Sequence, residues 1–267
     1  MRKLRCILFI LLVLTSEGVL ATVEHESVLR IHYGGSWLQD QYLAPVLYTG
    51  QKVGIGGDMH QVFKRHPDWS HVGKIDMQFH WLYNPAYTNV IYSAGVAGGW
   101  GAGYNWHLWG NHIHLLLGPY LDFDYLARWH VRNVNKPYSM DIALDLMAQG
   151  SITYTFKGKK SSYRLRYWIR ANLIGVDFVP DYWQSYYELT EGIAGHIRCS
   201  GMWNHRTLRH ELTLDLQFAH STWRVGIVHE YLEYGIKGLL FSREQVAAVV
   251  GTCFRFKTNP SHSLAPF

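Results

Sequence analysis

The most regular feature of the sequence is an alternation of apolar and polar side chains over long segments. It runs through residues 139–156 and returns at 162–172, after a short turn at 158–161. In the second segment, Leu165 and Arg166 are typical of the two alternating sets. Because successive side chains of a β-strand point to opposite faces, the pattern predicts a hairpin of two long strands. Each strand has one apolar face and one charged face.

The same alternation predicts eleven strands along the chain. Their expected ranges are 27–38, 50–63, 72–83, 89–105, 111–126, 139–156, 161–177, 190–203, 206–218, 222–235 and 243–256. Many are much longer than the five or six residues that are usual for a strand. A soluble β-sandwich or lipocalin-like barrel also alternates. Long strands with a continuous apolar face and with Trp or Tyr near its ends are instead typical of a barrel that crosses a membrane.

Composition and charge exclude other classes of protein. The chain has 267 residues, of which 48% are hydrophobic and 17% charged, which is too apolar for a disordered protein. The formal net charge is +5, and it is +3 without residues 1–21, which contain three basic residues and one acidic residue; this excess is too small to indicate a nucleic-acid partner. Apart from Cys6, the cysteines are Cys199 and Cys253, which can form one disulfide or remain two thiols.

The start of the chain has the pattern of a secretory signal. Basic residues precede an apolar stretch at 7–14, and small or apolar residues end at Ala21. We therefore expect residues 1–21 to be a removed signal peptide, 22–256 to form the barrel, and 257–267 to be a C-terminal tail.

The signal, the alternation and the last strand, Val-Ala-Ala-Val-Val-Gly-Thr-Cys-Phe-Arg-Phe at 246–256, resemble the outer-membrane β-barrel proteins of Gram-negative bacteria. This resemblance implies an all-β fold: a single closed antiparallel transmembrane barrel in the cell outer membrane. Such barrels have an even number of strands, so we expect twelve, with ten as the alternative. The implied partners are outer-membrane lipid, lipopolysaccharide and the barrel assembly machinery.

The lengths of the connections suggest which end of the barrel faces outward. Short turns are expected near 110–111, 158–161 and 204–205, and longer connections at 38–49, 129–138 and 178–189. In outer-membrane barrels the long loops lie on the outside. The loop at 178–189 contains Tyr182, Trp183, Tyr186 and Tyr187. We expect these side chains to form an aromatic collar at the membrane boundary, with a surface that contacts a ligand as the alternative.

The polar faces of the strands carry the strongest candidate site, a network of inward charges. Its expected members are Asp122, Asp124, Asp141, Asp145, Arg164, Arg166, Arg170, Arg209, Glu211 and Asp215. The side chains of a narrow barrel largely fill its interior, and unpaired buried charges are costly. We therefore expect the arginines of 164–170 to pair with Asp141, Asp145 and neighbouring carboxylates and to plug the lumen. A polar, porin-like pore whose arginines attract anions is the alternative.

A lipid hydrolase is the alternative function. In size and format the chain resembles the outer-membrane phospholipase and the lipid A deacylases, whose catalytic Ser commonly follows a His by two residues on one strand face. Only His25 and Ser27 have this spacing, and we expect them to be an incidental pair in a frayed terminus. His112 and His114 lack a third ligand, so no metal site and no cofactor are expected. The favoured function is that of a non-enzymatic barrel of structural, surface-interaction or narrow-channel type.

Overall fold

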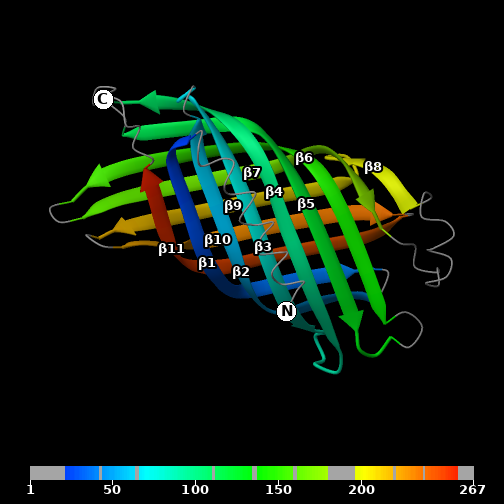
Figure 1. Cartoon of the computed structure of the whole chain (residues 1–267). Helices are drawn as coiled ribbons and strands as arrows, with labels where there is room; N and C mark the ends of the chain where they lie inside the picture. The colour runs from blue at the N-terminus through cyan, green and yellow to red at the C-terminus, as the bar shows by residue number, and fades with distance from the viewer. Residues whose placement is uncertain are drawn as a thin grey trace, which may run out of the picture.

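The computed structural model describes residues 22–41, 44–63, 66–109, 112–133, 137–158, 161–179, 196–218, 221–236 and 238–257. Within these ranges the chain forms an antiparallel β-barrel (Figure 1). Its strands are β1 (Thr22–Asp40), β2 (Ala44–Phe63), β3 (Trp69–Tyr83), β4 (Val90–Leu108), β5 (Ile113–His130), β6 (Tyr138–Lys157), β7 (Ser162–Phe178), β8 (Ile197–Gly201), β9 (His205–Gln217), β10 (Thr222–Ile236) and β11 (Leu239–Lys257).

Ten of the described strands form the closed ring of the barrel, and β8 is not part of that ring. Each strand from β1 to β7 pairs with the next, β7 pairs with β9, and β9, β10 and β11 lead back to β1. The prediction of a closed antiparallel barrel is confirmed, whereas the preferred count of twelve strands is wrong and the alternative of ten is right. The eighth predicted strand, at 190–203, has a described part that forms only the five-residue β8, which pairs with the last part of β7. A turn at 202–204 separates it from β9.

The two ends of the barrel differ in their connections. The links β2–β3, β4–β5, β6–β7 and β9–β10 lie at one end, together with the start of β1 and the end of β11. We call this the turn end. The other strand ends, among them the end of β7 and the start of β8, lie at the opposite end, which we call the loop end. The long connection predicted at 38–49 is wrong, because β1 continues to Asp40 and β2 begins at Ala44.

The outer surface of the barrel is apolar. Leu144, Leu165 and Leu212, which the alternation places on the apolar faces, are 45%, 40% and 46% exposed. The charged side chains between them are buried in the interior, as Arg166 and Asp215 illustrate. This inversion of the usual soluble pattern is the arrangement of a barrel surrounded by lipid.

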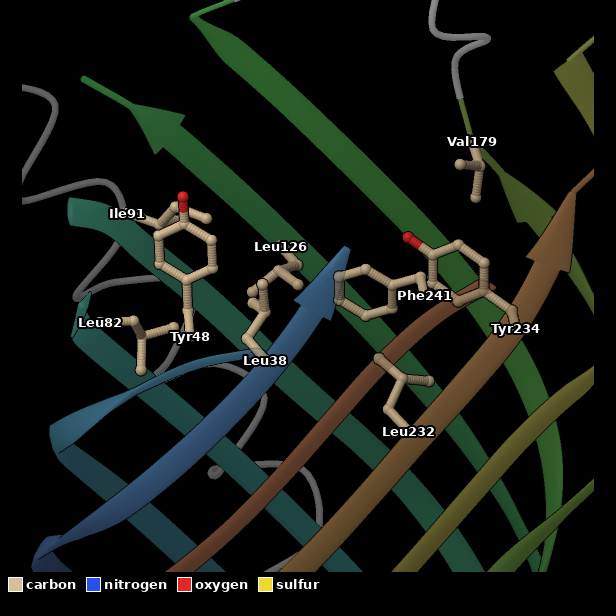
Figure 2. Close-up of a cluster of buried hydrophobic side chains, with 9 residues drawn as sticks. All are labelled: Leu38, Tyr48, Leu82, Ile91, Leu126, Val179, Leu232, Tyr234 and Phe241. Carbon is tan, nitrogen blue, oxygen red and sulfur yellow. The ribbon is translucent and has the colours of Figure 1, made fainter. Parts of the chain in front are cut away.

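The lumen contains a layer of apolar side chains near the loop end. Figure 2 shows this layer, which consists of Leu38, Tyr48, Leu82, Ile91, Leu126, Val179, Leu232, Tyr234 and Phe241. Most of these residues lie within a few positions of the loop-end terminus of their strand. Tyr234 and Phe241 stack at a centroid distance of 4.6 Å. The interior near the loop end is therefore apolar, although the alternation predicts polar side chains there.

Both remaining cysteines are free thiols: Cys253 is buried in the barrel and Cys199 is exposed on β8. Across the described ranges, no helix has the length and apolar character needed to span a membrane.

Candidate functional site: the charged lumen

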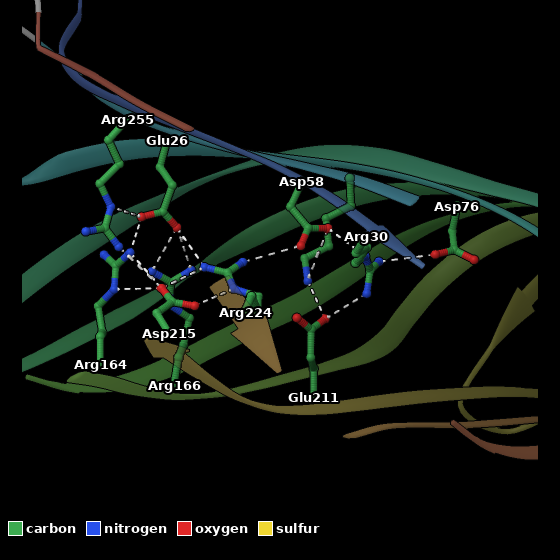
Figure 3. Close-up of polar contacts among 11 residues, drawn as sticks. Glu26, Arg30, Asp58, Asp76, Arg164, Arg166, Glu211, Asp215, Arg224 and Arg255 are labelled. Carbon is green, nitrogen blue, oxygen red and sulfur yellow. Dashed lines mark hydrogen bonds and ion pairs between the residues drawn. The ribbon is translucent and has the colours of Figure 1, made fainter. Parts of the chain in front are cut away.

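Glu26 of β1 is the centre of an ion-pair cluster inside the barrel, near the turn end (Figure 3). Its carboxylate lies 3.0 Å from Nε of Arg255, 2.8 Å from Nη2 of Arg224 and 3.3 Å from Nη2 of Arg166. Arg164 also pairs with it. These arginines come from β7, β10 and β11, so the cluster joins the two sides of the lumen.

Asp215 of β9 binds several of the same arginines. Its carboxylate is 2.7 Å from Nε of Arg224, 2.8 Å from Nη2 of Arg164 and 3.4 Å from Nη2 of Arg255. The strand register explains the contacts, because Arg164 and Arg224 lie directly opposite Asp215 on its two neighbouring strands. Glu26 likewise lies opposite Arg255. Among the described residues, four arginines thus share two carboxylates.

A second group continues the cluster toward the loop end and comprises Arg30, Asp58, Lys74, Asp76 and Glu211. Asp58 connects the groups, since it lies 3.5 Å from Arg224 and 3.3 Å from Arg30. Lys74 donates to Glu211 at 2.5 Å. Glu211 was expected in the network, and its partners come from β1 and β3, on the far side of the lumen.

The pairing predicted between the arginines of 164–170 and the aspartates of β6 is wrong. In the β6–β7 register, Arg166 is opposite Thr153, whereas Asp145 is opposite Gly175. The reason is the geometry of a hairpin: residues near the turn of one strand face residues near the turn of the other, and both aspartates lie far from that turn. Asp141 instead pairs with Arg128 at 2.8 Å.

The other expected members of the network lie nearer the loop end. Arg209 binds Asp122 at 2.9 Å and Asp124 at 2.6 Å. Arg170 stacks its guanidinium over the ring of Tyr120, 4.8 Å from the centroid. The structure therefore joins Arg164, Arg166, Glu211 and Asp215 in the cluster around Glu26 and its continuation. It places Arg209 with Asp122 and Asp124 in a separate group along the lumen.

Sequence reasoning missed several central members, namely Glu26, Arg30, Asp58, Lys74, Asp76, Arg224 and Arg255. The same alternation could have found most of them, because each lies on the polar set of its strand. Glu26 could not be found in this way, since the predicted first strand began at residue 27.

The described part of the lumen contains cavities at different heights. A small one of about 20 Å³ lies among Asp122, Asp145 and Arg209, toward the loop end. A larger one of about 430 Å³ lies at the turn end, against Glu26 and Arg164. The ion pairs and the apolar layer lie between the larger space and the loop end.

His25 and Ser27 lie within β1, which is paired on both sides, so the expectation of a frayed terminus is wrong. His25 Nε2 is 2.6 Å from Ser27 Oγ, and its Nδ1 is 2.7 Å from the side-chain amide of Gln61 on β2. Both belong to the set that alternates with the inward-facing Glu26 and Arg30. This Ser–His–amide row thus belongs to the outward-facing set at the turn end, where His25 and Gln61 are themselves buried.

The aromatic residues Tyr182, Trp183, Tyr186 and Tyr187 lie outside the described residues. Within the described part of the chain, no group of three or more His, Cys, Asp or Glu residues is arranged to hold a metal ion.

The fold resembles several solved outer-membrane barrels at low sequence identity. The outer membrane protease OmpT from Escherichia coli has 7% identity and a TM-score of 0.45, with 88% of this chain and 97% of that chain covered. The transport unit of the autotransporter AIDA-I from Escherichia coli has 9% identity and a TM-score of 0.43, covering 88% and 90%. The translocator domain of the autotransporter NalP from Neisseria meningitidis has 10% identity and a TM-score of 0.36, covering 94% and 96%. Similarities at this level assign no function.

Comparison with curated proteins finds no match. A family model covers residues 6–258, which is nearly the whole chain. The chain therefore belongs to the family described as "Protein of unknown function (DUF3316)".

Proposed function

We propose that this protein is an outer-membrane barrel without a continuous pore, so that it acts through its surfaces and not by conducting solutes. In this proposal residues 1–21 direct export and are removed, and the barrel assembly machinery inserts the chain. Outer-membrane lipid and lipopolysaccharide then surround the apolar exterior.

The apolar layer is the observation that carries the proposal. Leu38, Leu82 and Phe241 are fully buried inside the barrel, although a water-filled channel would expose them. Below this layer, ion pairs cross the lumen from Glu26 to Arg164 and from Arg30 to Glu211. A narrow lumen filled by side chains has no room for a column of water.

The test is the conductance of the purified protein in planar lipid bilayers. We expect no stable conductance steps under an applied voltage, with an open porin measured in parallel as the positive control. Steady steps of porin size from the wild-type protein would show that the lumen conducts and would refute the proposal.

A lipid-ester hydrolase is a second candidate, and the row Ser27–His25–Gln61 is the observation that favours it. The structure places the amide nitrogen of Gln61 at Nδ1 of His25. With the amide turned so that its oxygen faces Nδ1, the imidazole carries its proton there and Nε2 can accept the Ser27 proton. Ser27 Oγ would then bond to the ester carbonyl carbon. The His25 proton passes to the departing alcohol, and water releases the acyl group from Ser27.

The substrate class would be a glycerophospholipid of the leaflet at the turn end, because the row belongs to the outward-facing set there. Hydrolysis of a fluorogenic ester phospholipid by protein in vesicles tests this function. Activity that Ser27→Ala abolishes, and that Ser242→Ala on β11 leaves intact, would support it. Release of the fluorophore at the rate measured with protein-free vesicles would exclude the hydrolase function.

A further inference from the structure

The cavity at the turn end has the size and the lining of a small-molecule site. Its volume of about 430 Å³ lies within the range of about 300–1,000 Å³ that is typical of ligand pockets. Arg164, Arg166 and Glu26 line its charged side, and Thr153 and Thr155 add hydroxyl groups. A ligand would reach it from the turn end, because the apolar layer lies toward the other end.

The half of the ion-pair cluster next to this cavity carries an excess of positive charge. In the described part of the chain, this half holds four cations and two carboxylates, an excess of +2: Arg164, Arg166, Arg224 and Arg255 against Glu26 and Asp215. The half toward the loop end has the opposite excess, −1, when Asp58 is counted there with its partners Arg30 and Lys74, although Asp58 also lies 3.5 Å from Arg224: Arg30 and Lys74 against Asp58, Asp76 and Glu211. The cavity therefore lies at the positive side of the cluster.

Hydrogen-bond donors are also in excess beside the cavity. Each guanidinium has five N–H donors and each carboxylate about four acceptor sites, so the four arginines offer many more donors than Glu26 and Asp215 can accept. Arg166 reaches Glu26 only at 3.3 Å, through both of its Nη atoms. On the same wall, the buried Nε2 of His60 has no hydrogen-bond partner among the described residues. The spare guanidinium donors, and Nε2 of His60 in the tautomer that carries its proton there, can therefore bind acceptors from outside the cluster.

We propose that the cavity binds a small phosphate monoester that enters from the turn end. A phosphate monoester carries a charge of about −1.5 to −2 at neutral pH, which matches the local excess of +2. Its oxygens accept from guanidinium groups, which bind phosphate through paired N–H donors. Leu116 and the ring of Trp168 line the cavity as well and provide an apolar surface for the ester group. The proposal rests on the closed lumen, because closure makes this space a pocket instead of a passage.

Isothermal titration of the purified barrel in detergent tests the site with three probes of similar shape. Phenyl phosphate is the dianion, benzoate the monoanion and phenol the neutral compound. We expect phenyl phosphate to bind at least about tenfold more tightly than benzoate, phenol to bind weakest, and the affinity for phenyl phosphate to fall as salt is raised. Equal affinities for phenyl phosphate and phenol, or no heat of binding for any probe, would overturn the proposal.

Two variants locate the binding. Arg164→Gln removes a guanidinium at the cavity and should weaken phenyl phosphate binding by about ten- to a hundredfold, the range for one lost charge-assisted contact. Arg198→Gln removes the same charge at the loop end, where Arg198 pairs with Asp177, and should leave the affinity unchanged. Equal losses in both variants would refute binding at the turn end. The probe series on the wild-type protein stands even if one variant fails to fold.

The bilayer and titration experiments together distinguish a failure of the anion site from a failure of the proposed closed lumen. Channel conductance in bilayers would refute the closed lumen and, with it, the pocket. A non-conducting barrel that does not distinguish phenyl phosphate from phenol would refute the anion site alone.

Discussion

Replacing Glu26 by Gln should destabilise the barrel by about 3 kcal/mol or more. The carboxylate of Glu26 contacts four arginines, three of them at 2.8, 3.0 and 3.3 Å. Neutralising it leaves those arginines with Asp215 as the remaining carboxylate of their half of the cluster, and the local excess rises from +2 to +3. Breaking a buried ion pair by removing one partner typically costs about 3–5 kcal/mol, because the remaining charge is buried without compensation. The Gln amide oxygen still accepts one hydrogen bond, which places the expectation at the lower end of this range.

The measurement is the free energy of unfolding in lipid vesicles, from urea titration followed by tryptophan fluorescence. Glu244→Gln is the matched control, since Glu244 is 52% exposed and pairs with His229 on the outside of the barrel. An exposed pair contributes about 0–1 kcal/mol, so this variant should unfold close to wild type.

A double variant tests the cause of the destabilisation. Arg166 forms an ion pair with Glu26, so Glu26→Gln combined with Arg166→Gln removes one of the excess positive charges. The double variant should be more stable than the sum of the single effects predicts, by about 1 kcal/mol or more. A Glu26→Gln variant within about 1 kcal/mol of wild type, or strictly additive effects, would show that the cluster is not electrostatically coupled.

Three further predictions follow from the exterior, the apolar layer and the cysteines. Leu212→Arg on the outer surface should lower the free energy of unfolding by about 2–4 kcal/mol in the same assay if the residue lies near the middle of the membrane. The control Leu212→Ile should lower it by less than about 1.5 kcal/mol. Similar losses in both variants would contradict a lipid-facing position. Phe241→Ala should cost about 3–5 kcal/mol and should be the variant in which conductance steps appear first, so a silent, fully stable variant would argue against its role in closing the lumen. Maleimide should label the exposed Cys199 in the folded barrel much faster than the buried Cys253, and the reverse order would contradict the placement of these thiols.

The alternation of apolar and polar side chains along the chain was enough to predict the strands and their two faces. The expected strand at 139–156 corresponds to Tyr138–Lys157, and the one at 161–177 corresponds to Ser162–Phe178. Both predictions succeed because alternation is a local property: it depends on which face of one strand meets lipid, and neighbouring residues record that choice. The same information identifies Arg166 and Asp215 as inward-facing charges.

The number of strands depends on which edges meet, and no local pattern contains that information. The alternation predicts a full strand at 190–203, whereas the described strand there, Ile197–Gly201, is short and pairs with β7 alone. Likewise Leu38 and Leu82 interrupt the polar inner face and form the apolar layer, a role that appears only when the loop ends of most strands come together.

The partners of the inward charges were also decided by the tertiary structure. Alternation determines the face of a charged side chain, but neither its height along the barrel nor the strand across from it. Glu26 meets Arg164 although 138 residues separate them in the sequence, because closure of β11 onto β1 curves the sheet until its inner face meets itself. Asp145 and Arg166 belong to adjacent strands but lie at different heights, so they do not pair. A buried charge must find a partner within a few ångströms, and only the register and curvature of the closed sheet determine which charges come that near.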